Sequence, residues 1–175
     1  MKRMTLILGG ARSGKSTYAL TLAEKYKKVA FIATSLGLDR EMRQRIKLHK
    51  ESRPKHWTTF EEHKDLSKIL IGINGKFDCV IIDCMTLLVS NLILSGFTQE
   101  MILENINRFL STCSKSKANL IIVSNEVGLG LVPTNKLGRN FRDVAGRINQ
   151  ITAKHANKVY FMVAGLPLEI KRKGK

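Results

Sequence analysis

Residues 9–16 read "GGARSGKS", which matches the spacing G-x-x-x-x-G-K-S of a phosphate-binding loop. The loop follows the apolar run 4–8, which predicts a buried strand, and precedes a segment to about residue 25 that predicts a helix. In this context, backbone N–H groups of the loop and of the helix N-terminus wrap nucleotide phosphates. The sequence therefore predicts a P-loop nucleotide-binding site.

The side chains of this loop predict specific contacts. Lys15 is expected to reach the β- and γ-phosphates and to act in catalysis, and the Ser16 hydroxyl is expected to hold Mg²⁺. Asp83 ends the apolar run 78–83 and suits a second metal-side position, although capping of the following helix is an alternative. The predicted phosphate-binding residues are Gly9, Gly10, Ala11, Arg12, Ser13, Gly14, Lys15 and Ser16.

Apolar runs of strand length alternate with helical patterns along the chain, which favours an α/β protein with a mostly parallel sheet. Strands are expected at 4–8, 29–33, 56–60, 78–83 and 119–124, and a last strand at 158–165. A helix is expected at 39–50, with Asp39 as its N-cap. Two longer helices are predicted by core-facing stripes: Ile102, Ile106, Phe109, Leu110 and Cys113, then Leu137, Phe141, Val144, Ile148 and Ile151.

Composition limits the class of protein. The 175 residues suit one domain spanning 1–175, and no apolar run approaches the roughly 20 residues of a bilayer span. The apolar stretch near the N-terminus is too short for a signal sequence, so we expect a cytoplasmic protein. The three cysteines, Cys79, Cys84 and Cys113, are scattered, as expected of buried reduced thiols.

The net charge of +16 points to anionic partners, either nucleic acid or nucleoside triphosphates. Its densest zone lies at residues 40–55, and the tail reads "IKRKGK". Aromatic residues make up only 6% of the chain and do not alternate with the cations, so a base-stacking platform for nucleic acid is not expected.

Together these motifs resemble the bifunctional adenosylcobinamide kinase/adenosylcobinamide-phosphate guanylyltransferase family. The resemblance covers nearly the whole chain: "GGARSGKS" at 9–16, "IATS" at 32–35, "EMRQRIKLHKESRPKHWTTFE" at 41–61, "DCMTLLVSNL" at 83–92 and "VSNEVGLGLVPTNKLGRNFRDVAGRINQ" at 123–150. The glycine loop alone occurs in many enzymes, whereas "SNEVGLGLVP" followed by "FRDVAGRINQ" is highly specific.

The resemblance implies two reactions in cobalamin salvage and assembly. In the first, the γ-phosphoryl of ATP or GTP moves to the hydroxyl of adenosylcobinamide. In the second, GMP moves from GTP to adenosylcobinamide phosphate through a covalent GMP-histidine intermediate, and pyrophosphate is released. The resemblance also implies a RecA-like P-loop fold, Mg²⁺ as cofactor and a homotrimer, with no nucleic-acid partner.

His49 is the histidine that the resemblance assigns as nucleophile. Members of the family often carry two adjacent histidines here, whereas this chain has Leu48 at the first position, which leaves open whether both activities are retained. A neutral imidazole nitrogen can attack the α-phosphorus, and Lys47, Lys50 and Arg53 can neutralise the phosphate charge. His56 is interpreted as structural, and no role is assigned to His63 or His155, which are expected on helices.

The resemblance carries further nucleotide contacts onto two segments and one acid: Ala33, Thr34, Ser35, Lys50, Glu51, Ser52, Arg53 and Glu61. Thr34 or Ser35 can hydrogen-bond a phosphate or ribose from a strand end. Glu61 can accept hydrogen bonds from the guanine N1–H and N2–H₂, which would favour guanine over adenine.

Three other readings remain open from the residues alone. The chain could be a basic P-loop ATPase acting on nucleic acid, which salt-steep oligonucleotide binding would reveal. It could be a kinase of another small hydroxyl compound in which His49 is a bystander. It could also be a nucleotide-binding switch that changes shape without turnover.

Overall fold

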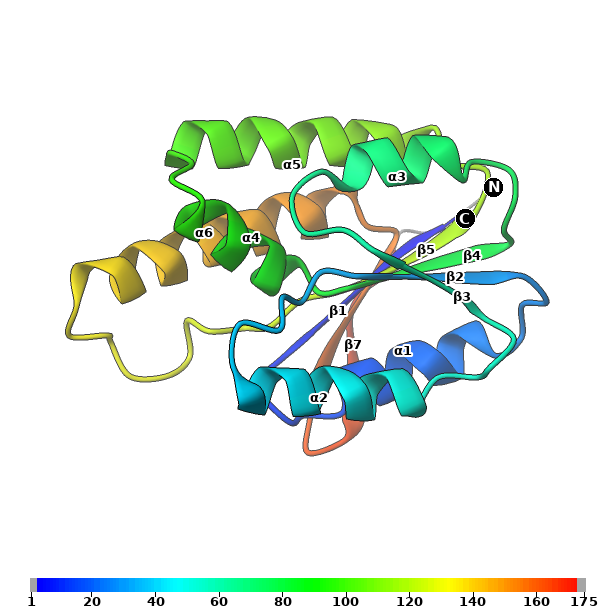
Figure 1. The fold of residues 1–175 in the computed structure, drawn as a ribbon, viewed down its shortest axis with the longest axis horizontal. Helices are drawn as coiled ribbons and strands as arrows, with labels where there is room; N and C mark the ends of the chain where they lie inside the picture. Colours follow the sequence, from blue (N-terminus) through cyan, green and yellow to red (C-terminus); the bar gives the residue numbers. More distant parts are fainter. Residues whose placement is uncertain (1–2, 173–175) are drawn as a thin grey trace.

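The computed structural model describes residues 3–172, apart from the side chain of Arg45, and this part of the chain forms a seven-stranded sheet (Figure 1). The strands are Met4–Gly9 (β1), Val29–Ala33 (β2), Thr58–Glu61 (β3), Cys79–Asp83 (β4), Asn119–Val123 (β5), Lys158–Val163 (β6) and Leu166–Arg172 (β7). Their order is β3-β2-β4-β5-β1-β6-β7, and all neighbours pair in parallel except β6 and β7, which pair antiparallel.

Helices cover both faces of this sheet, so the expected α/β fold with a mostly parallel sheet is confirmed and forms three layers (Figure 1). They are Lys15–Ala23 (α1), Arg40–Glu51 (α2), Leu66–Gly72 (α3), Met85–Leu94 (α4), Gln99–Ser114 (α5) and Lys136–His155 (α6). Helices α1 and α2 lie on one face, and α3, α4, α5 and α6 lie on the other. No helix within residues 3–172 is long and apolar enough to cross a membrane.

Alternation along the strands divides the core into two clusters. In β4, Val80 and Ile82 face the cluster under α3 to α6, whereas Cys79 and Ile81 face the cluster that contains α1 and Trp57. Side chains point alternately to the two faces of a strand, and here both faces are covered, so the strand reads as a continuous apolar run. Full burial of each large side chain contributes about 1.5–3 kcal/mol, which holds the strands in register.

The predicted helices at 39–50 and at the two apolar stripes are confirmed as α2, α5 and α6. Asp39 caps α2 by accepting a hydrogen bond from the backbone N–H of Met42 at 2.7 Å. Leu137 was expected in the core, but it is 55% exposed because it lies in the first turn of α6, beyond the helices that cover the sheet. A Cβ at Gly138 would lie 2.7 Å from the Pro133 Cβ, so this glycine permits a tight turn before α6.

Three expectations were incomplete or wrong. Residues 158–165 were expected to hold the last strand, but the hairpin continues into β7, which includes residues 170–172 of the basic tail. Residues 173–175 of that tail lie outside the described residues. Helices α3 and α4 were not predicted, and His63 lies in the loop before α3 rather than on a helix. His155 is the last residue of α6, as expected of a helical position.

The parallel strands end at one edge of the sheet. The glycine loop follows β1, Ser35 follows β2, Glu61 ends β3, and Asp83 ends β4. Open α/β sheets bind ligands at this edge, outside the carboxyl ends of the strands. The topology therefore brings most of the predicted site residues to one place.

Candidate functional site

The loop between β1 and α1 depends on two glycines. Gly9 has φ 151°, and a Cβ there would lie 2.6 Å from the Ser13 Oγ. Gly14 has φ 90°, caps α1, and a Cβ there would lie 3.2 Å from the Cα of Gly165. Such positive φ angles are strained for residues that carry a Cβ. The loop can therefore pass close to the β6–β7 turn and present its N–H groups only with glycine at these positions.

Lys15 is the first residue of α1, and its side chain folds back into the glycine loop. Its ammonium donates hydrogen bonds to the Gly10 carbonyl and to the Ser13 Oγ, the latter at 3.4 Å, and the residue is only 7% exposed. Burial lowers the pKa of Lys15, and the nearby negative charge of Asp83 opposes this shift. The result is a cation held in the curve of the loop, where phosphate oxygens would replace its carbonyl partner.

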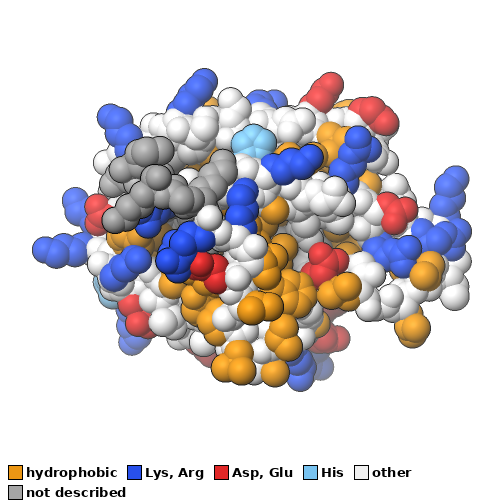
Figure 2. Space-filling view, turned by 180° about the vertical axis from the view of Figure 1, so that it is seen from behind, with side chains coloured by type: hydrophobic (Ala, Val, Ile, Leu, Met, Phe, Trp, Pro, Cys, Tyr) orange, Lys and Arg blue, Asp and Glu red, His pale blue; other side chains and the backbone are white. Residues whose placement is uncertain are grey.

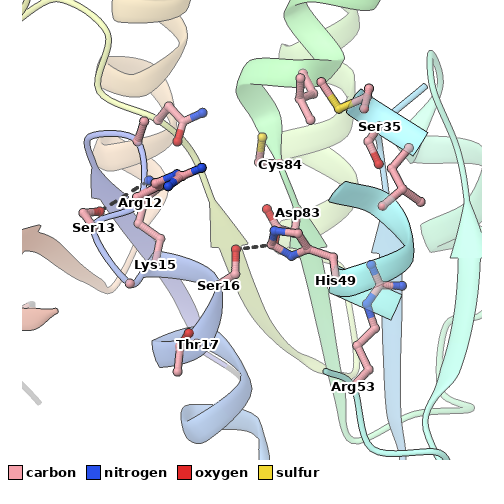
Figure 3. A pocket seen from close by; sticks show the side chains of 16 residues that line it. Arg12, Ser13, Lys15, Ser16, Thr17, Ser35, His49, Arg53, Asp83 and Cys84 are labelled. Atoms are coloured by element: carbon pink, nitrogen blue, oxygen red, sulfur yellow. Dashed lines mark hydrogen bonds between the residues drawn. The ribbon is translucent and has the colours of Figure 1, made fainter. Parts of the chain in front are cut away.

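Ser16 and Asp83 come together although they belong to different elements. The Ser16 Oγ donates a hydrogen bond of 2.7 Å to the Asp83 Oδ2 (Figure 3). Cys84, not Asp83, occupies the N-cap of α4, and no side chain caps that helix, so the capping alternative for Asp83 is not supported. A hydroxyl and a carboxylate are the hard oxygen donors that Mg²⁺ prefers.

These two oxygens fit a metal ion that is completed by phosphates and water. Within residues 3–172 no group of three or more His, Cys, Asp or Glu side chains could hold a metal by itself. Mg²⁺ usually keeps several waters and binds through one or two carboxylates together with substrate phosphates. The donor set at Ser16 and Asp83 has this composition.

One face of α2 forms the opposite wall. Met42, Ile46 and His49 follow one another at helical spacing along α2, and Arg53 lies just beyond its end. All four line the same cavity as the glycine loop. Figure 3 shows His49 reaching from this helix toward Ser16 and Asp83. Leu48, which stands where the family often has its first histidine, is 58% exposed and lies outside the lining.

The cavity has a volume of about 440 Å³, large enough for much of a nucleotide. Its charged lining consists of three cations, Arg12, Lys15 and Arg53, against the single carboxylate of Asp83, so it suits a polyphosphate. The full lining is Ala11, Arg12, Ser13, Gly14, Lys15, Ser16, Thr17, Ser35, Met42, Ile46, His49, Arg53, Asp83, Cys84, Leu87 and Asn125.

Arg53 is held in a defined position beneath His49. Its guanidinium carbon lies 3.7 Å from the centre of the Phe31 ring, and its Nη1 donates to the Thr59 Oγ1 at 3.5 Å. Burial lowers the pKa of Arg53, and the charges of Asp83 and Glu61 oppose that shift. The Nε is buried and has no hydrogen-bond partner among the described residues, so it is a donor suited to an anionic ligand.

Thr34 is placed differently from the expectation. It is fully buried, its Oγ1 donates to the Cys84 carbonyl at 2.7 Å, and it accepts from the Cys84 N–H at 2.8 Å. Its own carbonyl accepts from Asn91 Nδ2 at 2.8 Å. Thr34 therefore joins the ends of β2 and β4, whereas its neighbour Ser35 lines the cavity.

Besides Gly9 and Gly10 of the glycine loop, five other predicted contacts lie outside the cavity lining. Ala33 is buried in the core on the α1 side of the sheet. Lys50 forms an exposed ion pair of 3.2 Å with Glu61, and Glu51 pairs with Lys47 at 3.9 Å. The Ser52 Oγ donates to the His49 carbonyl at 3.0 Å and so closes the end of α2. Lys50, Glu51, Ser52 and Glu61 therefore lie at the His49 end of the site, outside the cavity.

Sequence reasoning missed several lining residues: Thr17, Met42, Ile46, Cys84, Leu87 and Asn125. Met42 and Ile46 precede His49 by seven and three positions, so helical spacing from the predicted nucleophile would have found them. Asn125 is the second residue beyond β5, and a polar side chain after a buried parallel strand was the available signal.

Comparisons with known proteins identify the family of this chain. The family model described as cobinamide kinase / cobinamide phosphate guanyltransferase matches residues 5–170. The bifunctional adenosylcobalamin biosynthesis protein CobU of Salmonella typhimurium LT2 is 38% identical over 180 residues, covering 96% of this chain and 99% of that protein. The bifunctional adenosylcobalamin biosynthesis protein CobP of Pseudomonas aeruginosa is 42% identical over 167 residues, covering 95% of this chain and 96% of that protein.

The fold is shared more widely. The KaiC-like protein PH0186 of Pyrococcus horikoshii OT3 superposes with a TM-score of 0.52 at 15% identity, covering 91% of this chain and 70% of that chain. This likeness, with the strand order and the glycine loop, confirms the expected RecA-like P-loop fold. The match of the family model over residues 5–170 and the identity to full-length relatives establish that this chain belongs to the cobinamide kinase / cobinamide phosphate guanyltransferase family.

Proposed function

We propose that this chain, as one domain over residues 1–175, phosphorylates adenosylcobinamide with ATP or GTP and then transfers GMP from GTP to the product through a covalent GMP–His49 intermediate. The observation that carries the proposal is that His49 lines the same cavity as Lys15 and Ser16. A triphosphate held by the glycine loop would thus share one cavity with the His49 imidazole. Leu48 is exposed and lies outside this cavity.

In the first reaction, the chain's part is to hold and neutralise the triphosphate. Backbone N–H groups of the loop bind phosphate oxygens, and Lys15 and Arg12 offset the charge on the transferred group. The acceptor hydroxyl oxygen forms a bond to the γ-phosphorus, the bond from this phosphorus to the β,γ-bridging oxygen breaks, and the nucleoside diphosphate leaves with that electron pair. The hydroxyl proton passes to solvent.

Ser16 and Asp83 are the residues that would hold Mg²⁺, Ser16 directly and Asp83 through water. When bound, Mg²⁺ neutralises charge on the β- and γ-phosphates. Asp83 also accepts a hydrogen bond from the Ser16 hydroxyl, which leaves the lone pairs of the Ser16 oxygen available to the metal.

In the second reaction, His49 is the nucleophile. An imidazole nitrogen bonds to the α-phosphorus of GTP, the bond from that phosphorus to the α,β-bridging oxygen breaks, and pyrophosphate leaves. A phosphate oxygen of adenosylcobinamide phosphate then attacks the same phosphorus, the N–P bond breaks, and the imidazole is restored. Arg53, whose Nε has no partner among residues 3–172, is our candidate for neutralising the α-phosphate during both steps.

The residues around the His49 end give candidates for base recognition. Glu61 and Lys50 form an exposed pair, and Glu61 remains our candidate acceptor for the guanine N1–H and N2–H₂. Ser35 is the proposed polar contact from the end of β2. We propose a supporting role for the remaining four predicted contacts. Ala33 is buried, and the side chains of Thr34, Glu51 and Ser52 bond to other groups of the protein.

The covalent step is tested by intact mass. The protein incubated with GTP and Mg²⁺ should gain the mass of one GMP, in an adduct that is labile to acid and stable to base. His49→Ala should abolish the adduct, whereas His56→Ala should keep it, since His56 lies outside the cavity and packs its ring 6.4 Å from Trp57. Normal labelling of His49→Ala would place the nucleophile elsewhere.

We also propose a homotrimer in the cytoplasm. Figure 2 shows apolar side chains gathered on the face where β7 forms the sheet edge, and Leu166, Leu168 and Ile170 of β7 are 72%, 58% and 56% exposed. Apolar surface of this kind is typical of interfaces. The buried free thiols of Cys79, Cys84 and Cys113 suit a reducing compartment. A native mass near three times 19.7 kDa would support the assembly, and a monomer would refute it.

A further inference from the structure

Asn125 lines the site cavity, but no individual role is predicted for it from the sequence. It follows β5, the strand between β1, which carries the glycine loop, and β4, which carries Asp83. Its neighbours continue the ladder onto β1, because the Ser124 N–H donates to the Ile7 carbonyl at 3.0 Å and the Glu126 N–H donates to the Gly9 carbonyl at 2.9 Å. Asn125 is thereby fixed beside the first residue of the phosphate-binding loop.

A buried polar network clamps the main chain of Asn125. Its N–H donates to the Thr86 Oγ1 at 2.6 Å, and its carbonyl accepts from the Asn149 Nδ2 at 3.0 Å. The Ser124 Oγ joins these two partners, donating to the Asn149 Oδ1 at 2.7 Å and lying 3.0 Å from the Thr86 Oγ1. Thr86, Ser124 and Asn149 are at most 5% exposed, and such a satisfied network fixes one geometry.

The side chain of Asn125 is left free for a ligand by this arrangement. The network uses only its backbone groups, and no residue within the described part of the chain hydrogen-bonds its amide. Asn125 lines the cavity together with Arg12 and Lys15. An amide carries two donors and one acceptor oxygen, so it can contact a phosphoryl oxygen and a hydroxyl at the same time.

Asn125 and His49 approach the cavity from different elements of the fold. Asn125 follows β5, next to the loop strand, whereas His49 lies on α2, which follows β2 on the far side of β4. In a P-loop, the β- and γ-phosphates lie at the loop and its lysine. This order of strands favours contact of Asn125 with the γ-phosphoryl end and of His49 with the α-phosphorus.

We propose that Asn125 is a catalytic residue of the phosphoryl-transfer step, and that it is not needed for formation of the GMP–His49 adduct. Its Nδ2 donates to an oxygen of the γ-phosphoryl group, and its Oδ1 accepts from the alcohol hydroxyl as the new O–P bond forms and the bond to the β,γ-bridging oxygen breaks. Thr86, Ser124 and Asn149 are positioning residues that hold it there. This inference rests on the function proposed above.

The test compares Asn125→Ala and Asn125→Asp with Asn107→Ala, a control at an exposed position of α5. Phosphoryl transfer to cobinamide, the GMP adduct by intact mass, and the thermal midpoint are measured for each protein. Asn125→Ala should lower kcat for phosphoryl transfer about 100-fold, with the adduct forming within about twofold of the wild-type rate. Asn125→Asp should lower kcat at least as much, since it removes the donor and adds charge beside phosphates.

The outcomes separate the two proposals. Phosphoryl transfer within twofold of wild type in both Asn125 variants would overturn this inference alone. Equal loss of both half-reactions at an unchanged thermal midpoint would overturn the selective assignment, because Asn125 would then serve nucleotide binding in general. Absence of both activities in the wild-type protein would overturn the proposed function and this inference with it.

Discussion

The Ser16 Oγ and the Asp83 Oδ2 are joined by a hydrogen bond of 2.7 Å, although the residues stand 67 positions apart. We predict that Asp83→Asn lowers the affinity for Mg²⁺ in nucleotide binding by roughly 10–100-fold, which is the usual effect of losing an outer-sphere partner. The amide can still meet the Ser16 hydroxyl, so the fold should persist. Titration of Mg²⁺ at a fixed concentration of a fluorescent GTP analogue measures the shift.

Ser16→Ala should have a similar effect, and the double variant should add little to either single change, since both act on one site. Asp78→Asn is the matched control, because Asp78 accepts from the Lys28 N–H at the other end of β4. If Asp83→Asn and Asp78→Asn responded alike to Mg²⁺, the metal assignment at Ser16 and Asp83 would be wrong.

The cap of α2 offers a second prediction. Asp39→Ala removes the side-chain acceptor of the Met42 N–H and should destabilise α2 by about 1 kcal/mol. Local opening would then make the amides of α2 exchange about fivefold faster, and the GMP adduct should form more slowly because α2 carries His49. Hydrogen exchange followed by mass spectrometry resolves the helix.

Thr98→Ala is the corresponding control at α5, where the Thr98 Oγ1 accepts from the Met101 N–H at 3.3 Å. It should speed exchange in α5 and leave adduct formation unchanged. If Asp39→Ala left both exchange in α2 and the adduct rate at wild-type values, the cap would not matter for holding His49 at the cavity.

The fold was predictable where local chemistry and pattern agree. The glycine loop predicted the start of α1, and Asp39 predicted the start of α2. Both are local signals, and the structure keeps both helix starts. The strand β7 was missed because Leu166 to Arg172 mixes exposed apolar residues with charges and lies at an edge, with no buried face to produce a pattern. Helix α4 was missed because it is apolar on most sides and has no capping side chain.

The site residues likewise fall into those that the sequence predicts and those that it does not. Lys15, Ser16 and Asp83 could be placed from the sequence, because the first two begin the helix after the glycine loop and Asp83 ends a strand. Thr34 was misplaced because nothing in the sequence shows that its hydroxyl bonds the Cys84 backbone instead of facing the cavity. Asn125 was missed because its position depends on Thr86 and Asn149, which are distant in the sequence.

Arg53 gives a third prediction. Its guanidinium stacks on Phe31 at 3.7 Å, and its buried Nε is unpartnered within the described residues. Arg53→Lys keeps the charge but loses the planar stacking and the Nε donor. We expect about a tenfold slower formation of the GMP adduct, consistent with the 0.5–2 kcal/mol or so that such a stacked cation contributes. Rapid-quench intact mass gives the rate.

Phe31→Leu should reproduce part of this loss, because it removes the ring face while conserving most of the apolar volume, at a stability cost below about 1.5 kcal/mol. Arg40→Lys, at the exposed start of α2, is the control and should react as the wild type does. An Arg53→Lys protein with an unaltered adduct rate would show that charge alone suffices at this position.

The cysteines give a fourth prediction, about reactivity and pH. Burial, together with the negative charge of Asp83, raises the pKa of the Cys84 thiol to about 12, although Cys84 borders the cavity. Because the thiolate is the reactive form, at pH 8 only about one molecule in 10⁴ carries it. Cys84 should therefore resist alkylation in the folded protein despite its place beside the phosphate-binding loop.

Burial also raises the pKa of Cys79 to about 12, and it raises the pKa of Cys113 as well. Both thiols should therefore resist alkylation as Cys84 does. Peptide mapping after iodoacetamide at pH 8 should show all three thiols unmodified in the native protein and fully modified in 6 M guanidinium. Raising the pH toward 10 increases the thiolate fraction about 100-fold, so slow alkylation is expected there first. Rapid modification of Cys84 at pH 8, with Cys79 and Cys113 protected, would instead mean that the cavity opens to solvent more widely than the burial of Cys84 indicates.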